Sequence, residues 1–193
     1  MFLLYSFLLT IAFVLLSPLL ILRSGKYLAG FRQRLGFIPK FDPEDQPVVW
    51  LHCVSVGETQ AARPLVTELK KELPDHKLVI STTTRTGQKL AKEVFADEAD
   101  LVFYFPYDWR NTVRRSLRRI KPKVVLLMET EIWFNFIREA GKQEIKIAIV
   151  NGRLSERSAA RYKWITNTFR RVFHYVDLAM VQTAADAKRF LAF

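Results

Sequence analysis

The sequence is short of several residue types, and each shortage excludes a class of protein. One cysteine among 193 residues excludes an intramolecular disulfide and favours a reducing compartment. That cysteine, Cys53, falls within an apolar run, where a free thiol is usually a small core residue rather than a nucleophile. The three histidines are scattered and have no cysteine or carboxylate at ligand spacing, so we expect no metal site.

The glycine motifs of nucleotide-binding proteins are missing as well. The seven glycines form neither the G-x-G-x-x-G pattern of dinucleotide-binding domains nor the G-x-x-x-x-G-K-[ST] pattern of phosphate-binding loops. We therefore expect no cofactor and exclude the dinucleotide enzymes.

Acidic residues are outnumbered, with 19 Asp and Glu against 30 Lys and Arg and a net charge of +11. Such an excess favours an anionic partner, and nucleic acid and anionic lipid are the two obvious ones. A nucleic-acid binder would show steeply salt-dependent binding. The N-terminus favours lipid, so we expect no nucleic acid.

Charge is absent from Phe2 to Leu22, and about 20 apolar residues suffice to cross a bilayer. Basic residues come directly afterwards, an order opposite to that of a cleaved signal peptide. By the positive-inside rule, residues 1–22 are predicted to be a single membrane-anchor helix with the globular part on the cytoplasmic face. The alternatives are an interfacial or re-entrant anchor interrupted at Pro18 and a buried helix.

Residues 23–47 form a basic connector that glycine and proline punctuate. Its cations are interleaved with aromatic side chains, which is typical of a segment on a lipid surface, where each cation contributes about 1 kcal/mol. A solvated linker is the alternative.

From residue 48 onward, short apolar runs alternate with helical periodicity. The runs cover 48–54, 77–81, 100–105, 123–128, 145–150 and 177–181. This alternation predicts βαβ units, and hence a Rossmann-like α/β domain with a mainly parallel sheet over residues 48–193. A basic amphipathic helix is expected over 108–120, with its charged face either solvated or on anionic lipid.

Polar residues follow each predicted strand and should line one edge of the sheet, the usual ligand site of an open α/β fold. We interpret Asp108, Ser155 and Thr183 as helix N-caps. Capping does not explain Glu129 and Glu131, which follow an apolar strand. They need either an arginine from the next loop or a substrate as partner.

The junction after the first strand reads Ser55-Val56-Gly57-Glu58. We expect Gly57 to make the tight turn and Glu58 to lie at the ligand edge. The alternative role for Glu58 is a favourable interaction with the dipole of its own helix.

Five segments that follow successive strands together resemble the 3-deoxy-D-manno-octulosonic acid (Kdo) transferases of lipopolysaccharide synthesis. They are Ser55–Glu58, Thr82–Gly87, Pro106–Asp108, Glu129–Trp133 with Asn135, and Asn151–Ser158. The resemblance covers essentially the whole chain. It implies the N-terminal half of a B-type glycosyltransferase fold, in which this half binds the lipid acceptor and a C-terminal half binds CMP-Kdo.

The resemblance further implies a metal-independent transfer of Kdo from CMP-Kdo to a lipid A precursor at the bacterial inner membrane, among anionic lipids. It makes Glu58 the general base, a role that typically contributes about 10²–10⁴-fold to the rate. The residues expected to bind the acceptor or shape its groove are Ser55, Gly57, Arg85, Glu129, Glu131, Arg153 and Arg157.

The sequence ends at Phe193, within an expected helix, and no donor domain follows. We therefore expect the isolated chain to be inactive without a donor domain. The alternative is a non-catalytic, membrane-anchored module that binds lipid or glycolipid.

Overall fold

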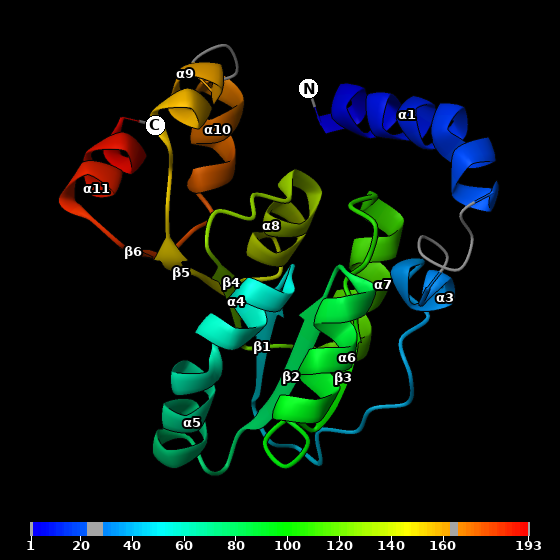
Figure 1. Cartoon of the computed structure of the whole chain (residues 1–193), viewed down its shortest axis with the longest axis vertical. Coiled ribbons are helices and arrows are strands. Elements are labelled where there is room, and N and C mark those ends of the chain that lie inside the picture. The colour runs from blue at the N-terminus through cyan, green and yellow to red at the C-terminus, as the bar shows by residue number, and fades with distance from the viewer. Residues whose placement is uncertain (1, 23–28, 163–165, 193) are drawn as a thin grey trace.

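The computed structural model describes residues 2–22, 29–162 and 166–192. Its centre is a six-stranded parallel sheet in the order β3-β2-β1-β4-β5-β6 (Figure 1). The strands are β1 (Val48–Cys53), β2 (Lys77–Thr82), β3 (Leu101–Tyr104), β4 (Val124–Met128), β5 (Lys146–Gly152) and β6 (Leu178–Val181). Each predicted apolar run overlaps one strand, so the Rossmann-like prediction is confirmed.

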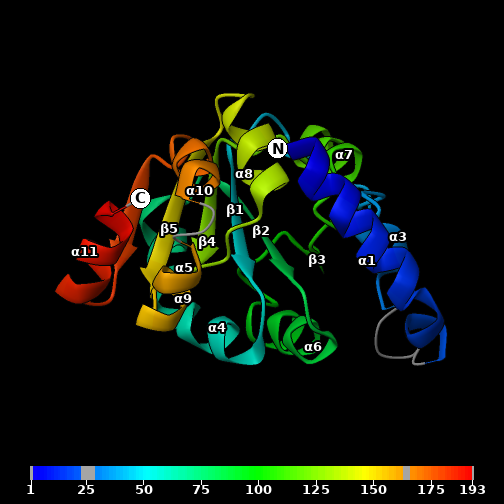
Figure 2. The same ribbon diagram turned by 90° about the horizontal axis from the view of Figure 1, so that it is seen from above.

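Helices cover both faces of the sheet (Figure 2). One face carries α5 (Arg63–Glu72) and α6 (Arg85–Val94), and the other carries α7 (Arg110–Ile120), α8 (Phe134–Gly141) and α10 (Thr166–Phe173). The chain also forms α1 (Phe2–Leu22), α3 (Phe31–Arg34), α4 (Val56–Ala61), α9 (Glu156–Tyr162) and α11 (Ala184–Leu191). Two large apolar cores result, because the strands of a covered parallel sheet are buried on both sides, and a third, smaller cluster holds Ile149, Leu154 and Phe190.

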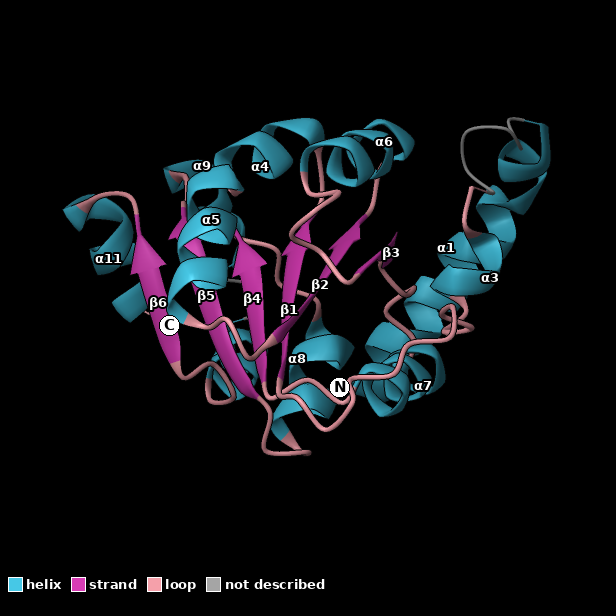
Figure 3. Ribbon diagram, turned by 90° about the horizontal axis from the view of Figure 1, so that it is seen from below, coloured by secondary structure: helices cyan, strands magenta, loops and turns pink. Residues whose placement is uncertain are grey.

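The direction of winding reverses between β1 and β4, which pair with Leu51 opposite Leu126. In a doubly wound sheet this switch point leaves a crevice at the carboxyl ends of the strands. Figure 3 shows the arrowheads of both strands at the edge where α4 and α6 begin. The segments after β1 and β4 therefore lie at the expected ligand edge.

Helix α1 lies along the domain, beside α7 and α8 (Figures 1 and 2). Three hydrogen bonds dock it: Tyr5 Oη to Asp108 Oδ2 at 2.9 Å, Asn135 Nδ2 to Ser6 Oγ at 3.0 Å, and Trp109 Nε1 to Thr10 Oγ1 at 3.1 Å. Over the described residues, the structure contains no helix with both the length and the apolarity needed to cross a bilayer. The spanning anchor is therefore not supported, and the hydroxyl groups of Tyr5, Ser6 and Thr10 take part in docking the helix.

The described part of the connector, from residue 29, packs against the edge of the sheet. Tyr104 N donates to Gln33 Oε1 at 2.9 Å, and Tyr107 N donates to the Arg34 carbonyl at 2.8 Å. This differs from a segment on lipid or a solvated linker. An edge strand such as β3 leaves backbone groups without partners, and the connector supplies them. Residues 23–28 lie outside the described residues.

The charged face of α7 is exposed, as expected for a solvated surface, and several of its arginines also make specific contacts. Nε of Arg110 and Nε of Arg114 donate to the Glu139 carboxylate at 3.2 and 2.6 Å. Glu139, on α8, is only 1% exposed. Arg115 and Arg119 donate to carbonyl groups of the connector. These contacts tie α7 to its neighbours, and Arg110 and Arg114 supply the cationic partners that the buried Glu139 carboxylate requires.

Candidate functional site

Glu58 lies in the first turn of α4, directly after β1. Its Oε2 accepts a hydrogen bond from Val54 N at 2.8 Å, and its Oε1 accepts one from Ser55 Oγ at 3.0 Å. Ser55 is the N-cap of α4, and the Glu58 side chain reaches back in the manner of a capping box. The carboxylate is thus held in one position and is 5% exposed.

Glu129 and Glu131, which follow β4, complete an acidic cluster with Glu58. Burial raises the pKa of Glu58, the hydrogen bonds from Val54 and Ser55 lower it, and the nearby Glu129 raises it further. Burial also raises the pKa of Glu131 to about 7, with additions from Glu58 and Glu129. In the part of the chain that the structure describes, neither Glu129 nor Glu131 forms an ion pair. The ion pair with an arginine of the loop after β5, one of the two expected partners, is therefore not present there.

The N-terminus of α6 packs directly against the turn between β1 and α4. A Cβ atom at Gly87 would lie 2.8 Å from Thr84 Oγ1 and 3.3 Å from the carbonyl carbon of Ser55. A larger residue there would have to displace the Thr84 hydroxyl and press on the Ser55 backbone. Arg85 is the first residue of α6 and is exposed at this junction.

Gly57 does not make the tight turn expected from the sequence. It is an exposed residue within α4, and a Cβ atom there would meet only Ser55 Oγ, at 3.9 Å. The helix begins immediately after β1 because Ser55 caps it, so no left-handed residue is needed there.

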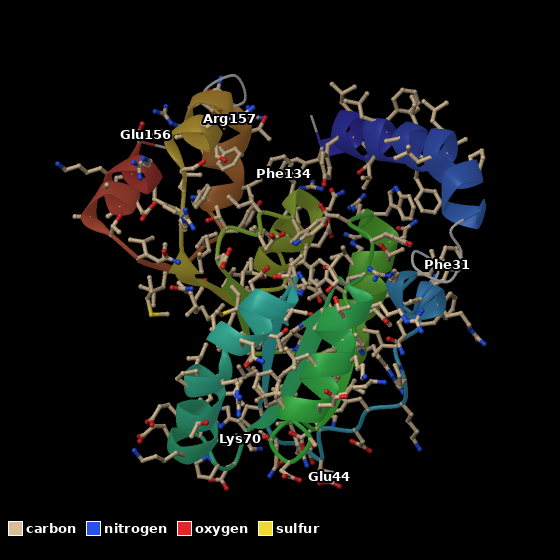
Figure 4. The ribbon with its side chains drawn as sticks, in the orientation of Figure 1. Phe31, Glu44, Lys70, Phe134, Glu156 and Arg157 are labelled. Carbon is tan, nitrogen blue, oxygen red and sulfur yellow. The ribbon has the colours of Figure 1, made fainter. Side chains whose placement is uncertain are left out.

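The two arginines expected from the loop after β5 take different positions. Arg153 N donates to Thr130 Oγ1 at 3.1 Å, which joins its loop to the one that carries the glutamates. Arg157 is exposed on α9 (Figure 4), and Figure 1 shows this helix well away from α4. The structure thus gathers Ser55, Glu58, Glu129 and Glu131, brings the Arg153 backbone alongside, and leaves Arg157 apart.

All three residues predicted to cap helices do so, but Asp108 caps a different helix from the one expected. Ser155 Oγ accepts from Ser158 N at 3.2 Å, and Thr183 Oγ1 accepts from Asp186 N at 3.0 Å. Asp108 instead caps α8, where Oδ2 accepts from Asn135 N at 3.0 Å and Oδ1 accepts from Phe136 N at 2.8 Å. The local sequence could not reveal this contact, because it joins two segments far apart in the chain.

The fold and the acidic cluster define the class: a Rossmann-like domain with one buried and two half-buried carboxylates at its switch point. Among solved structures, the chain is similar to UDP-GlcNAc 2-epimerase from Neisseria meningitidis, with a TM-score of 0.53 and 16% identity. The similarity covers 76% of this chain and 43% of that one. At this identity the likeness supports the fold alone.

The family follows from the sequence itself. The family model of 3-deoxy-D-manno-octulosonic-acid transferase matches residues 29–193, so the chain belongs to this family. The enzyme of that name from Chlamydia trachomatis (serovar D) is 28% identical over 191 residues, which is 97% of this chain and 44% of the relative. The one from Haemophilus influenzae is 32% identical over 172 residues, 89% of this chain and 40% of the relative. The chain spans less than half the length of these relatives.

Proposed function

We propose that the chain supplies the acceptor-binding half of a transferase that moves Kdo from CMP-Kdo to a lipid A precursor. The observation that carries the proposal is the buried Glu58 carboxylate, held at the carboxyl end of β1 with a raised pKa. A general base is most effective when its pKa approaches the working pH. Membership of the Kdo transferase family supports the same reaction class.

In the proposed reaction, Glu58 takes the proton of an acceptor hydroxyl while that oxygen forms a bond to the anomeric carbon of Kdo. The bond from this carbon to the CMP phosphate oxygen breaks, and CMP leaves with the electron pair. Two hydrogen bonds occupy part of the acceptor capacity of the carboxylate, which offers about four lone-pair sites. The carboxylate can therefore still accept a hydrogen bond from the incoming hydroxyl. CMP-Kdo is assigned to a separate donor domain, and no metal is required.

Helix α1 is proposed to hold the domain at the cytoplasmic surface of the bacterial inner membrane as an interfacial anchor. Its outward face exposes Leu3, Phe7 and Leu15 by 82%, 61% and 74%. Near its N-terminus, Arg170 and Arg171 line a hollow with Phe2. Apolar side chains flanked by cations suit an interface that contains anionic lipid.

The test replaces Glu58 by Gln in the chain combined with a separately supplied donor half. We expect kcat to fall by about 100-fold or more, as for the loss of a general base. Glu93→Gln, on the exposed side of α6, is the matched control and should keep full turnover. Turnover within a few-fold in Glu58→Gln, together with its loss in Glu131→Gln, would contradict the assignment.

The second candidate is a non-catalytic module that binds lipid or glycolipid, which the exposed apolar face of α1 favours. Vesicle binding without transfer, both with and without the donor half, would support this module and remove the catalytic role. Transfer that appears only on complementation supports the transferase.

A further inference from the structure

A hollow of about 530 Å³ lies where the N-terminal end of α1 meets α8 and α10. Phe134 of α8 joins the three helices, because its ring centroid lies 5.1 Å from that of Tyr5 on α1 and 5.8 Å from that of Phe169 on α10. In Figures 1 and 2, α8 lies between α10 and the N-terminal end of α1. The walls of the hollow are therefore packed against one another.

The lining of the hollow is strongly basic. Four arginine and lysine residues line it from α8, from the residue after α8 and from α10: Arg138, Lys142, Arg170 and Arg171. The described residues that line it include no aspartate or glutamate. Arg138 is half-buried, whereas the other three are exposed and form no ion pair with a carboxylate of the described residues. The hollow is therefore suited to an anion.

Helix C-termini explain part of this charge but not all of it. Arg138 lies in the last turn of α8, and Arg170 and Arg171 lie in the last turn of α10, where cations interact favourably with the helix dipole. Each helix end carries about half a negative charge, so the two ends together offset about one cation. Glu139 offsets no more than one other, and two arginines of α7 share its carboxylate with Arg138. An excess of about two positive charges therefore remains at the hollow.

Two contacts fix the shape of the hollow. The Arg138 guanidinium lies 4.5 Å from the centroid of the Phe2 ring, and its Nη1 donates to Glu139 Oε1 at 3.2 Å. Tyr175 packs directly on the end of α8, since a Cβ atom at Gly141 would overlap its ring. Side chains that are already positioned lose less conformational entropy when a ligand binds, so the hollow favours a bound group over a diffuse cloud of ions.

The exposed apolar side of α1 begins beside the hollow. Leu3, next to the lining residue Phe2, is 82% exposed, and Phe7, one helical turn further, is 61% exposed. Side chains at positions i and i+4 lie on the same face of a helix. A ligand that matches both features carries an apolar part for α1 and an anionic group for the hollow. An anionic phospholipid has both parts, whereas a free anion or a nucleic acid has no acyl chain.

We propose that the hollow between α1, α8 and α10 is a headgroup site, in which Arg138, Arg170 and Arg171 hold the phosphate of an anionic phospholipid while α1 lies among the acyl chains. Arginine suits this group, because its planar donors match two phosphate oxygens at once. The site rests on the interfacial anchor that the proposed function assigns to α1, and it names the lipid that the anchor meets.

The bound lipid is distinct from the acceptor. Helices α8 and α10 end at the hollow and lead into the amino ends of β5 and β6. Glu58, in contrast, follows the carboxyl end of β1, at the opposite edge of a parallel sheet. A headgroup held in the hollow would therefore orient the domain on the membrane without occupying the place of the reacting hydroxyl.

The test measures binding of the full chain to vesicles of phosphatidylcholine alone and of phosphatidylcholine mixed with phosphatidylglycerol. We expect the unchanged chain to bind the anionic vesicles at least about tenfold more tightly. Arg170→Gln combined with Arg171→Gln should remove most of this preference and leave binding to neutral vesicles unchanged. Both side chains are exposed, so the variant should fold. Replacing both by Lys keeps the charge and should retain most of the preference.

Lys89→Gln combined with Lys92→Gln is the matched control, because it removes two exposed cations from α6, on the other face of the sheet. It should bind anionic vesicles like the unchanged chain. Equal weakening in this control would show attraction by net charge alone and would overturn the site. Unchanged binding in the variant that lacks Arg170 and Arg171 would overturn it as well.

Soluble glycerol phosphate distinguishes a lipid from a free phosphate as the ligand. Titration calorimetry should find it at least about tenfold weaker than monomeric short-chain phosphatidylglycerol, because it lacks the apolar part that α1 would bury. Equal affinity of the two would make free phosphate the ligand and overturn the lipid site.

Replacing Leu3, Phe7 and Leu15 by Ser separates the headgroup site from the interfacial anchor. This variant should lose binding to neutral and anionic vesicles alike, whereas loss of Arg170 and Arg171 should remove only the preference for anionic ones. If the Ser variant bound normally and the arginine variant did not, the anchor would fail and the headgroup site would stand. The reverse result would leave the anchor and remove the headgroup site.

Discussion

At the residue scale, Glu58 combines two roles that compete for its charge. As a capping residue it accepts hydrogen bonds that stabilise the ionised form and lower its pKa. As a buried member of an acidic cluster it is pushed toward the protonated form. Burial is the largest effect, so the balance is a raised pKa in a carboxylate that two hydrogen bonds position. This combination suits a base better than an exposed glutamate would.

Glu131 should make the protein less stable as the pH rises. Its pKa is raised from 4.5 to about 7 in the folded state, so between these values the folded chain binds more protons than the unfolded chain. The free energy of unfolding then falls as pH rises through this window. Glu131→Gln should remove much of this fall and raise stability at pH 8 by about 1–2 kcal/mol, after discounting for solvent screening. Urea denaturation at pH 5 and pH 8 measures it; a variant with an unchanged pH slope would contradict the expectation.

Two glycines near Glu58 should respond oppositely to alanine. Gly87→Ala brings Cβ against the Thr84 side chain and the Ser55 backbone, and should destabilise by about 1–3 kcal/mol. Gly57→Ala meets open space in a helix and should stabilise by about 0.5–1 kcal/mol. Thermal unfolding of the two variants provides the comparison. A stabilised Gly57→Ala that nevertheless binds acceptor poorly would support close approach of the acceptor at Gly57.

At the scale of elements, Asp108 joins three helices. It precedes α7, caps α8 through two backbone N–H groups, and accepts the Tyr5 hydroxyl of α1. Burial raises its pKa to about 7, while these hydrogen bonds lower it. The position of α1 therefore depends on Asp108, the same residue that caps α8.

The two contacts of Asp108 can be separated by substitution. Tyr5→Phe removes the bond to α1 and should cost about 1 kcal/mol, while α8 keeps its cap. Asp108→Ala removes both and should cost about 2–4 kcal/mol, since the α8 donors are left buried without partners. Hydrogen exchange is the measurement: Tyr5→Phe should speed exchange in α1 alone. Faster exchange in α8 as well would show that the two contacts are not independent.

At the scale of the whole molecule, α1 is apolar on both its inward and its outward side. Phe13 faces inward, where its ring contacts those of Tyr107 and Trp109, while Leu3, Phe7 and Leu15 face outward. A helix packed on a soluble core normally carries polar residues on its outward side. The inward side is explained by the three docking hydrogen bonds, and the outward side lacks a partner among the described residues. A membrane interface is the partner that the proposed function assigns to it.

Vesicle binding tests this assignment. Replacing Leu3, Phe7 and Leu15 by Ser should weaken binding to anionic vesicles by at least about tenfold, because each buried side chain contributes about 1.5–3 kcal/mol. Leu178→Ser is the control, an exposed apolar residue on β6 at the other side of the molecule (Figure 1). Equal weakening in the control, or none in the triple variant, would contradict the interfacial anchor.

The strands were predictable because each is a short apolar run between turn residues, and that signal is local. The Thr183 and Ser155 caps were predictable for the same reason, since each cap lies next to its helix. The partners of Arg34 and Glu139 were not. Nothing beside Arg34 or Glu139 in the sequence indicates burial, and only the packing of distant segments shows that both are buried.

The sequence by itself determined the parallel sheet, the family and the edge at which Glu58 lies. The apolar runs and the polar motifs that follow them are local features, which can be found without knowing the contacts between distant segments. Only the tertiary structure decided that α1 docks on the domain, that Asp108 caps α8, and that Arg34 turns inward to the Thr83 carbonyl. Those outcomes depend on which buried polar groups find partners across distant segments. The pattern of residues along the chain does not show these partners, since the free energy of a buried charge depends on the groups that surround it in space.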